Sequence, residues 1–268
     1  MRLVAIHLHP LKSGATFALD AARVERRGLE HDRRWLVVDA SGRFVTGRQE
    51  PRLVLIRATP FAGGIDLDAP GMSSLRVLAP EGNADRVEVT VWDDRIDAAA
   101  CDGAADAWLS RDLGRPARLA YMDELAPRPV DPAYARPDDR VSVADAFPLL
   151  LIGTGAIDGL NARLSTPLPV ERFRPNLVVE TATPHAEDGW ARIRIGALEL
   201  ELVKPCTRCA FTTVDPASGT FDGSGEPLAT LKTYRRTPKG ITFGQNAIPR
   251  SFGELRLGDP VEVLEHRL

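Results

Sequence analysis

Short runs of alternating apolar and polar residues dominate the first half of the chain, which is the period-two pattern of strands with one buried face. Residues that favour turns separate the runs. The predicted strands are RLVAIHL (2–8), RRWLVVD (33–39), RLVLIRATP (52–60) and RVEVTVWDDRIDA (86–98). Ser41 and Gly42 are typical of a hairpin turn after the second run. This half therefore predicts a small antiparallel barrel or sandwich.

The second half mixes strand-like runs with helical spacing. Strands are predicted in NLVVE (176–180), ARIRIG (191–196), ALELELVKP (197–205), AFTTVD (210–215) and VEVLEH (261–266). Apolar residues at helical spacing predict helices in DGAADAWLSRDLG (102–114), GAIDGLNARLS (155–165) and EPLATLKTYRR (226–236). The tryptophans Trp35, Trp92 and Trp190 are expected in the core.

Two joined domains are predicted, over residues 1–118 and 119–268. The first ends after the helix at 102–114, for which Gly114 provides a stop. The proline-bearing stretch 126–140 disfavours regular structure, and it reads either as a linker or as an ordered loop over a cleft. The fold class is therefore mainly β (α+β), a β-barrel-like N-terminal domain packed on a second β-rich domain with a few peripheral helices.

Composition places the chain among ordinary soluble proteins. It is 44% hydrophobic and 26% charged, with a formal net charge of -3, so no nucleic-acid partner is implied. The longest apolar run, FPLLLIG (147–153), is far shorter than the roughly 20 residues of a membrane span. Three cysteines form no disulfide framework and fit a reducing compartment. We expect a cytoplasmic protein without a membrane span or signal peptide.

KPCTRC (204–209) places two of the three cysteines three positions apart between basic residues. A structural zinc site needs four ligands, and none of the five histidines completes one, so zinc is not expected. A redox pair is disfavoured because the motif follows a strand rather than opening a helix. An iron–sulfur cluster would need four cysteines. Buried small hydrophobes or a single metal-binding thiolate remain as alternatives, and the cationic neighbours favour the thiolate.

The longer run KPCTRCAFTTVDPASGTFDGSGEPLATLKTYRR (204–236) resembles the signature of the MOSC family, which includes molybdenum-cofactor sulfurase C-termini and amidoxime-reducing components. HDRRWLVVDASGRFVTGRQEPRLVLI (31–56) resembles the companion N-terminal MOSC β-barrel domain. FRPNLVVE (173–180), FGQNAIP (243–249) and GDPVEVL (258–264) are similar to further landmarks of the family. The resemblance spans nearly the whole chain and implies a MOSC-type β-barrel for the second domain.

The resemblance implies a molybdenum ion held by one pterin dithiolene and one protein cysteine. The cysteine in the matching position is Cys209, which is thus the predicted metal ligand and catalytic residue, with Cys206 as a bystander. Soft thiolate sulfur suits such a metal. The predicted cofactor is Mo-molybdopterin, with neither zinc nor an iron–sulfur cluster in this chain.

The other cofactor-binding residues are carried over in the same way. Lys12, Ser13 and Arg33 match residues that contact the terminal phosphate, and Arg174 and Asn176 match residues that hold the pterin. Thr207 and Arg208 match positions near the metal and the pterin, and Asp145 matches an aspartate of the relatives. Relatives have small hydroxyl residues after the aspartate, where this chain has Ala146 and Phe147. That departure removes the hydroxyl contacts expected there. The full set is Lys12, Ser13, Arg33, Asp145, Arg174, Asn176, Thr207, Arg208 and Cys209.

The implied activity is the reduction of N-hydroxylated small molecules such as amidoximes and hydroxylamines. The chain contains no cysteine-rich domain for electron delivery, so a separate donor is expected, either a ferredoxin or a cytochrome b5-type protein with an NADH-dependent reductase. The alternative is a carrier that holds the cofactor, or a persulfide on Cys209, and passes it to another enzyme. A degenerate structural module is the third alternative, against which the matched residues argue.

Overall fold

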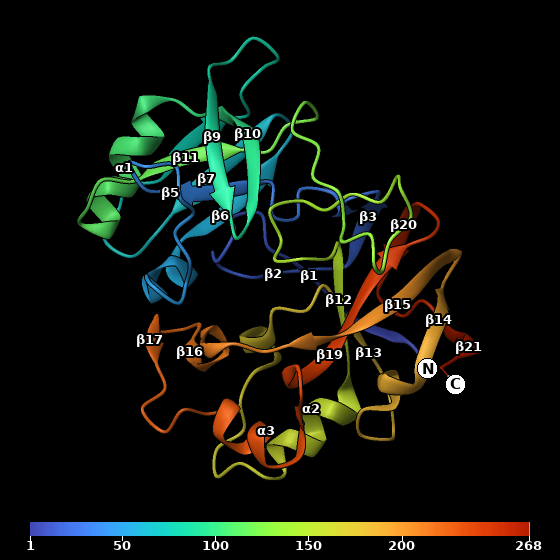
Figure 1. Cartoon of the computed structure of the whole chain (residues 1–268). Helices are drawn as coiled ribbons and strands as arrows, with labels where there is room; N and C mark the ends of the chain where they lie inside the picture. The colour runs from blue at the N-terminus through green and yellow to red at the C-terminus, as the bar shows by residue number, and fades with distance from the viewer. Residues whose placement is uncertain (268) are drawn as a thin grey trace.

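A computed structural model describes residues 1–267 and consists mainly of β-strands, with three α-helices in that range. The mainly β fold class predicted from the sequence is therefore confirmed. Figure 1 shows two lobes, one above the other, with loops between them. The first lobe is built around residues 35–121. The second lobe is built around residues 149–266 together with the first strands of the chain.

The second lobe is organised by one long sheet with the strand order β2, β1, β13, β12, β19, β15, β14, β21, in which β18 also pairs with β19. β12 and β13 run parallel, whereas β12 and β19 run antiparallel. The bounds are β1 Leu3–Leu8, β2 Phe17–Leu19, β12 Leu149–Gly153, β13 Leu177–Val179, β14 Trp190–Ile195, β15 Leu198–Thr207, β18 Arg236–Thr237, β19 Gly240–Pro249 and β21 Val261–His266.

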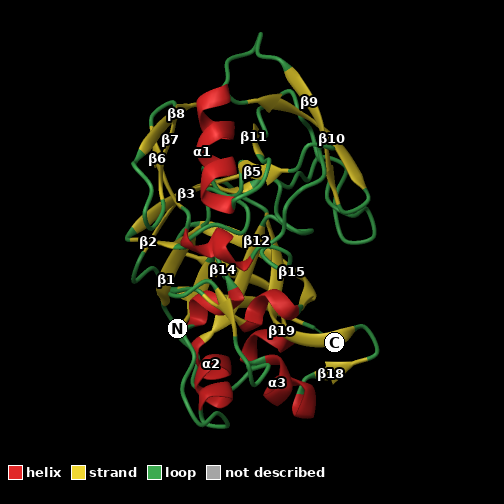
Figure 2. Cartoon of the chain, turned by 90° about the vertical axis from the view of Figure 1, so that its left-hand side faces the viewer, coloured by secondary structure: helices red, strands yellow, loops and turns green. Residues whose placement is uncertain are grey.

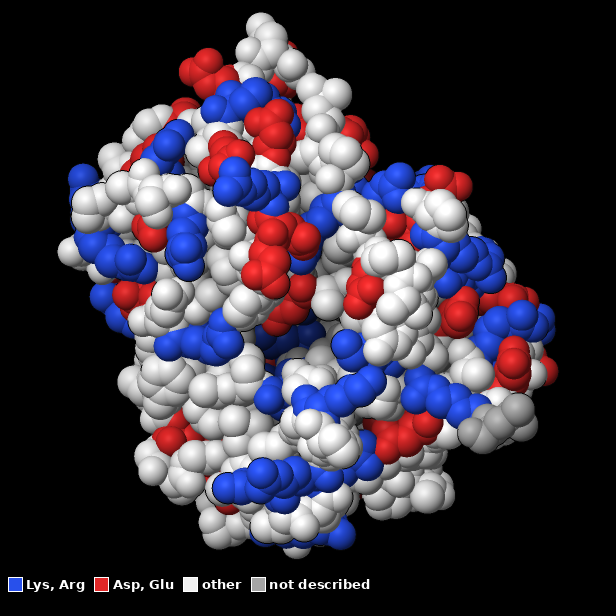
Figure 3. Space-filling model, in the orientation of Figure 1, with Lys and Arg blue, Asp and Glu red and all other residues white. Residues whose placement is uncertain are grey.

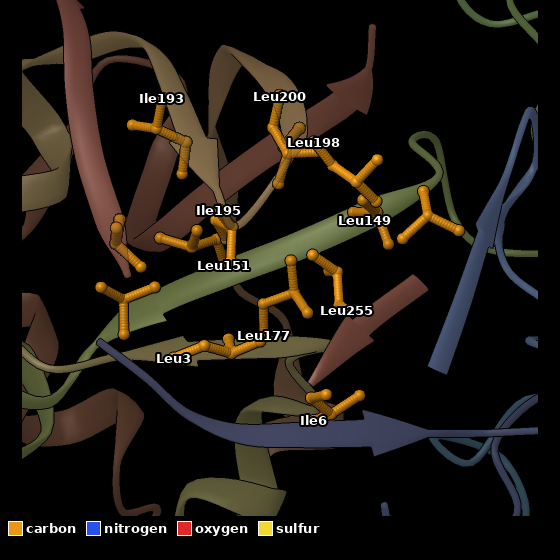
Figure 4. Close-up of a cluster of buried hydrophobic side chains, with 14 of the residues drawn as sticks. Leu3, Ile6, Leu149, Leu151, Leu177, Ile193, Ile195, Leu198, Leu200 and Leu255 are labelled. Atoms are coloured by element: carbon orange, nitrogen blue, oxygen red, sulfur yellow. The ribbon is translucent and has the colours of Figure 1, made fainter. Parts of the chain in front are cut away.

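Leucine and isoleucine side chains from this sheet meet in one core (Figure 4). Leu151, Leu177, Ile193 and Leu200 are fully buried, although they come from four different strands. In β15 the residues Leu198, Leu200 and Leu202 are buried while the glutamates between them are less so. The period-two pattern of ALELEL therefore reports one buried sheet face, because successive side chains of a strand point to opposite sides.

The first lobe contains an antiparallel sheet in the order β5, β11, β10, β9 and a second one in the order β6, β7, β8. Their bounds are β5 Trp35–Val38, β6 Arg57–Phe61, β7 Gly64–Asp68, β8 Leu75–Leu78, β9 Arg86–Val91, β10 Asp94–Ala100 and β11 Arg118–Tyr121. The turn predicted at Ser41 and Gly42 is present, but it leads only to isolated bridges, Val38 with Phe44 and Arg43 with Thr90, rather than to a second strand.

The predicted helix at 102–114 is confirmed as α1, Gly103–Leu113. The Asp102 side chain caps its first turn, and Gly114 ends it in a left-handed conformation with φ 67°. Figure 2 shows α1 across the strands of the first lobe, far from the other two helices. These are α2, Thr154–Asn161, and α3, Leu228–Tyr234, both on the second lobe. α1 and α3 fall within segments that the sequence predicts to be helical, and α2 begins one residue before its predicted segment 155–165.

Strands from the start of the chain also pair with strands from its second half. β3, Ala21–Glu25, pairs on one side with β4, Gly28–Leu29, and on the other with β20, Gly253–Arg256, from near the end of the chain. β1 pairs with β13 in the sheet of the second lobe. The first thirty or so residues therefore share sheets with the second half of the chain. The division at residues 118 and 119 stays a proposal.

Two predicted strands are wrong in part. Residues 51–55 form the 3-10 helix η1, Pro51–Leu55, because proline at the first position has the fixed φ of a helical start. Residues 210–213 form η4, Ala210–Thr213, before the short pair β16, Val214–Asp215, and β17, Thr220–Phe221. The hydroxyls of Thr212 and Thr213 bond to carbonyls three residues back at 2.9 and 2.8 Å, which favours a turn over a strand.

The stretch 126–140 is an ordered loop. Arg128 is buried, and its Nε donates to Asp94 at the tip of the β9–β10 hairpin at 2.7 Å. Its Nη1 donates to the carbonyl of Ser142 at 3.0 Å. Val130 packs in a small core with Phe147 and Ile248. The remaining 3-10 helices are η2, Val170–Phe173, and η3, Ala186–Gly189. No helix within residues 1–267 has the length and apolarity needed to cross a membrane.

Gly28 in β4 generates a stability prediction. Its φ is +105°, and a Cβ there would lie 2.4 Å from the carbonyl oxygen of Pro148. Gly63 has a similar φ of +94°, but a Cβ there would meet none of the described atoms within 4 Å. Gly63→Ala should lower the unfolding free energy by about 1 to 2 kcal/mol through backbone strain alone. Gly28→Ala should cost at least about 1 kcal/mol more, because the backbone contact adds to the strain.

Urea unfolding of the two variants measures this difference. Equal losses of unfolding free energy in the two proteins would show that the contact with Pro148 contributes nothing to the cost.

Candidate functional site

All nine predicted site residues line one pocket between the two lobes. Lys12, Ser13 and Arg33 come from the segments around β1 and β5, and the other six come from the second half of the chain. Figure 3 shows a hollow between the upper and lower parts of the molecule, with blue lysine or arginine atoms inside it. The structure therefore brings the residues together, although it does not test the role predicted for each.

Lys12 occupies one end of the pocket and is buried. Its Nζ donates to the carbonyl of Val143 at 2.7 Å and to Oδ1 of Asp145 at 2.8 Å. The ring of Phe44 lies beneath the same ammonium group, with 5.3 Å to the centroid. Burial lowers the pKa of Lys12, and the charge of Asp145 opposes that shift. The side chain is thus held in one place as a donor facing the pocket.

Ser13 follows in a left-handed conformation with φ 66°, and its hydroxyl accepts a hydrogen bond from the backbone N–H of Gly47 at 3.1 Å. The turn that contains Lys12 and Ser13 is therefore pinned to a second loop of the same lobe. A lysine and a hydroxyl presented from one turn form the kind of cradle that binds phosphate.

Arg33 links the two lobes. It is ion-paired with the buried carboxylate of Asp32, its Nη1 donates to Oδ1 of Asn176 at 3.2 Å, and its Nη2 donates to the carbonyl of Arg174 at 3.1 Å. Burial opposes ionisation of Asp32, but Arg33 and His9 outweigh it and lower the pKa of Asp32 to about 2. Asp32 therefore stays charged at any physiological pH, and Arg33 stays oriented.

Arg174 lies beside this pair without a carboxylate partner among residues 1–267. Its Nη1 donates to the carbonyl of Gly14 at 2.6 Å, while its buried Nη2 has no hydrogen-bond partner in the described chain. Burial and the charge of Arg33 lower the pKa of Arg174 to about 9. A buried cation with an unused donor is costly unless an anion or an acceptor completes it. This end of the pocket therefore favours an anionic ligand.

Asn176 has a different environment. It is 1% exposed, its Oδ1 accepts the N–H of Leu150 at 3.2 Å, and its Nδ2 donates to the carbonyl of His7 at 3.3 Å. With Arg33 also bonded to Oδ1, the amide joins β1, β12 and the arginine. Asn176 lines the pocket as a rigid support whose polar atoms are already paired.

The cysteine end of the pocket lies where β15 meets η4. Cys209 directly precedes η4, and its carbonyl accepts the N–H of Thr212 at 3.1 Å. Cys206 also lines the pocket, and its sulfur lies 2.9 Å from Nη1 of Arg208. Nη2 of Arg208 donates to the carbonyl of Phe173 at 2.6 Å, and its buried Nε has no partner among the described residues. A second, half-buried guanidinium thus has a buried donor without a partner among the described residues, close to the sulfur of Cys206.

Asp145 marks the mouth of the pocket, where its side chain is 71% exposed. Partial enclosure opposes ionisation, but Lys12 and Arg33 outweigh it and hold the pKa of Asp145 well below the ordinary carboxyl value. Trp92 lies near this carboxylate and also contributes to its lowered pKa. Trp92 is 42% exposed, so the expectation that it lies in the core is wrong, whereas Trp35 and Trp190 are buried.

Backbone strain is concentrated around this pocket. Within residues 1–267, six residues other than glycine have a positive φ, and Ser13, Arg33, Trp92 and Arg174 are four of them. A left-handed conformation costs about 1–2 kcal/mol for such residues. Conformations of that kind persist where surrounding contacts enforce them, and they cluster at functional sites.

Sequence reasoning missed several pocket residues, among them three with polar or aromatic side chains. Phe211 lies in the segment wrongly predicted as a strand, Asn246 lies within the FGQNAIP landmark, and Arg172 stands one residue before the FRPN landmark. Arg172 is buried beside Asp222 at 3.6 Å, which makes it part of the pocket wall. Each of these residues lies close in sequence to a predicted residue or landmark, and this closeness is the signal that could have identified it.

The donor set fits a pterin cofactor with a phosphate at one end and a thiolate-bound metal at the other. Lys12, Ser13 and Arg174 offer donors to an anion, and Arg208 offers an unused donor near Cys206 in the wall that also contains Cys209. Among residues 1–267, no group of three or more His, Cys, Asp or Glu side chains is arranged to hold a metal ion. A metal here would therefore rest on Cys209 and on ligands supplied by the cofactor itself.

Two family models match most of this chain. Residues 1–116 match the MOSC N-terminal beta barrel domain, and residues 138–262 match the MOSC domain. The chain is 41% identical to mitochondrial amidoxime-reducing component 1 of Danio rerio over 268 residues, which cover 95% of this chain and 82% of that protein. It is 34% identical to the Homo sapiens protein of the same name over 276 residues, which cover 96% and 81%.

The resemblance predicted from KPCTRC and the other landmarks is confirmed by these matches. The chain belongs to the MOSC family that includes the mitochondrial amidoxime-reducing components, with an N-terminal MOSC β-barrel domain followed by a MOSC domain.

Proposed function

We propose that this protein is a molybdenum-cofactor-dependent oxidoreductase that reduces N-hydroxylated compounds, such as amidoximes and hydroxylamines, to the parent amines or amidines. One observation carries the proposal: Lys12, Ser13 and Arg33 share a single pocket with Arg174 and Cys209, although more than 130 positions separate the two groups in sequence. The names of the relatives, which describe amidoxime reduction by those proteins, support the same activity.

The chain's own residues would hold the cofactor at both ends. Lys12, Ser13 and Arg33 would bind the terminal phosphate, and the unused Nη2 of Arg174 would donate to the cofactor between the two ends. Thr207 and Arg208 would contact the pterin close to the metal, and Asp145 would contribute a carboxylate from the mouth. Asn176 would fix the backbone on which Arg33 and Arg174 depend.

Cys209 would be the protein ligand of the metal, while Cys206 remains a neighbour whose sulfur is engaged by Arg208. When bound, the molybdenum cofactor supplies the two-electron redox centre for cleavage of the N–O bond. The overall reaction consumes two electrons and two protons and releases water: R–NH–OH + 2e⁻ + 2H⁺ → R–NH₂ + H₂O. The residues around the sulfur hold the substrate against this centre. The positive charges of Arg174 and Arg208 stabilise the anionic cofactor in the pocket.

Electrons would come from a separate carrier, a ferredoxin or a cytochrome b5-type protein served by an NADH-dependent reductase. The substrate would be a small molecule that reaches the pocket from the hollow seen in Figure 3. The names of the relatives describe those proteins as mitochondrial. A cytoplasmic location for this chain stays a prediction.

Replacing each of the two neighbouring cysteines in turn shows whether one cysteine or both bind the metal. Cys209→Ala should remove bound molybdenum and turnover together, because the metal loses its protein ligand. Cys206→Ala should retain molybdenum near the level of the unchanged protein. The measurement is metal content per chain by mass spectrometry, on protein produced in a host that makes the cofactor, followed by benzamidoxime-dependent oxidation of a reduced dye.

Equal loss of molybdenum in both variants would contradict the single-ligand assignment. A protein that binds the cofactor, or carries a persulfide on Cys209, but never oxidises the dye would instead support the carrier function.

Replacement of Lys12 tests the phosphate end independently of turnover. Lys12→Gln removes a charge-assisted hydrogen bond, so the cofactor should be retained about 10- to 100-fold less tightly. Lys232→Gln on α3, where the side chain is exposed, is the matched control and should leave retention unchanged. The measurement is pterin fluorescence, after oxidation of the released cofactor, along a dialysis series. Identical pterin loss from both variants would remove Lys12 from the binding site.

A further inference from the structure

Phe211 is an aromatic wall of the pocket that the predicted site residues leave out. It stands two residues after Cys209 in η4 and lines the same pocket. Its side chain is partly exposed, so the ring is accessible to a bound molecule. The position of this ring therefore limits the space beside the cysteine.

Gly47 in the first lobe determines how closely that ring can approach. A Cβ on Gly47 would lie 2.1, 2.5 and 2.7 Å from three ring carbons of Phe211, all far inside the normal contact distance. The φ of Gly47 is not among the positive values, so the backbone conformation itself does not require glycine. The ring of Phe211 is what requires glycine at position 47. The residue is glycine because the aromatic side chain of the other lobe occupies the space of a side chain.

Further contacts fix both sides of this packing. The N–H of Gly47 donates to the hydroxyl of Ser13 at 3.1 Å, which holds the loop of the first lobe. The guanidinium of Arg174 lies over the ring of Phe211, 5.6 Å from its centroid, and is itself anchored to the carbonyl of Gly14 at 2.6 Å. The ring is thus enclosed by Gly47 and Arg174, and neither group is free to retreat. Close-packed atoms resist displacement because few voids exist to receive them.

We propose that Phe211 is the specificity-determining wall of the pocket, held beside Cys209 by its contact with Gly47, and that it restricts the group that can approach the cysteine to small or flat molecules. This inference rests on the proposed function where it concerns substrates. The preferred class is N-hydroxylated compounds with a slender or planar substituent on the reacting nitrogen, such as hydroxylamine itself or an aryl amidoxime. Branched substituents meet the ring.

The reactivity of the Cys209 thiol tests the wall without any cofactor. The full chain is produced in a host that does not make the cofactor, with Cys101→Ala and Cys206→Ala, so that Cys209 is the one remaining thiol. The rates of alkylation by iodoacetamide and by a bulky fluorescein iodoacetamide are then compared. Phe211→Ala should accelerate the bulky reagent at least about tenfold, equivalent to about 1.4 kcal/mol of barrier, and iodoacetamide by much less.

Gly47→Ala supplies the reciprocal change, because a methyl group there must push the ring away from the first lobe and toward the pocket. It should slow the bulky reagent about tenfold relative to iodoacetamide. Gly103→Ala, at the first position of α1, where a Cβ meets none of the described atoms within 4 Å, is the matched control and should change neither rate. In the double variant Gly47→Ala/Phe211→Ala the methyl group meets no ring, so the rates should return to those of Phe211→Ala.

Each outcome decides the proposal. If Phe211→Ala accelerated alkylation equally with both reagents, or with neither, Phe211 would not be a wall that restricts access to Cys209. A Gly47→Ala protein with the rates of Gly103→Ala would overturn the role of the contact, and the Phe211→Ala result still stands alone if Gly47→Ala does not fold. With the cofactor present, Phe211→Ala should lower KM for a branched N-hydroxylated amine but not for hydroxylamine. Absence of turnover with every substrate would contradict the proposed function, while the alkylation rates still report on the wall.

Discussion

The constraint on which the rest of the structure depends is the burial of several positive charges between the two lobes. Lys12, Arg33 and Arg174 all lie in one pocket, and only Lys12 and Arg33 have a carboxylate partner among residues 1–267. Burial of a charge is unfavourable unless hydrogen bonds and counter-charges compensate it. Carbonyl groups of Val143, Arg174 and Gly14 supply part of that compensation. The lobes must therefore be joined by contacts other than these cations.

Strand pairing holds the start of the chain in the second lobe, and just after β1 Leu11 forms a bridge with Trp35 of β5 in the first lobe. β3 pairs with β20 through four residues, from Val24 with Gly253 to Ala21 with Arg256. β1 enters the long sheet beside β13, and its Leu3 and Ile6 are buried in the same core as Leu151. The segment that carries Lys12 and Ser13 leaves this anchored strand directly. The cationic groups are thus positioned by apolar burial and backbone hydrogen bonds that do not involve them.

Local pattern predicted the parts of the fold that local physics determines. The alternation of ALELEL, the end of α1 at Gly114, and the turn at Ser41 and Gly42 all depend on neighbours in sequence, and the structure has each of them. Residues 51–55 and 210–213 were misassigned because apolar and β-branched residues also occur in 3-10 turns, where a proline or threonine hydroxyls decide the outcome. The β3–β20 pairing spans most of the chain, so no local pattern indicates it.

The residues of the site also divide into those that a sequence motif indicates and those that only contacts between distant segments require. Gly47 shows the difference. The nine predicted residues were found because the resemblance carries motif positions, and a motif records which residue types a ligand needs. Trp92 lies outside the runs that resemble the family, and Gly47 lies inside the run 31–56 but was given no role there. Gly47 is needed because a ring from residue 211 lies against it, and Trp92 reaches Asp145 because the tip of a hairpin from one lobe meets a loop of the other. Such requirements arise only from contacts between distant segments. The glycine that appears least informative in sequence is therefore one of the residues that shape the pocket, since its missing side chain is what allows the two lobes to meet beside the cysteine.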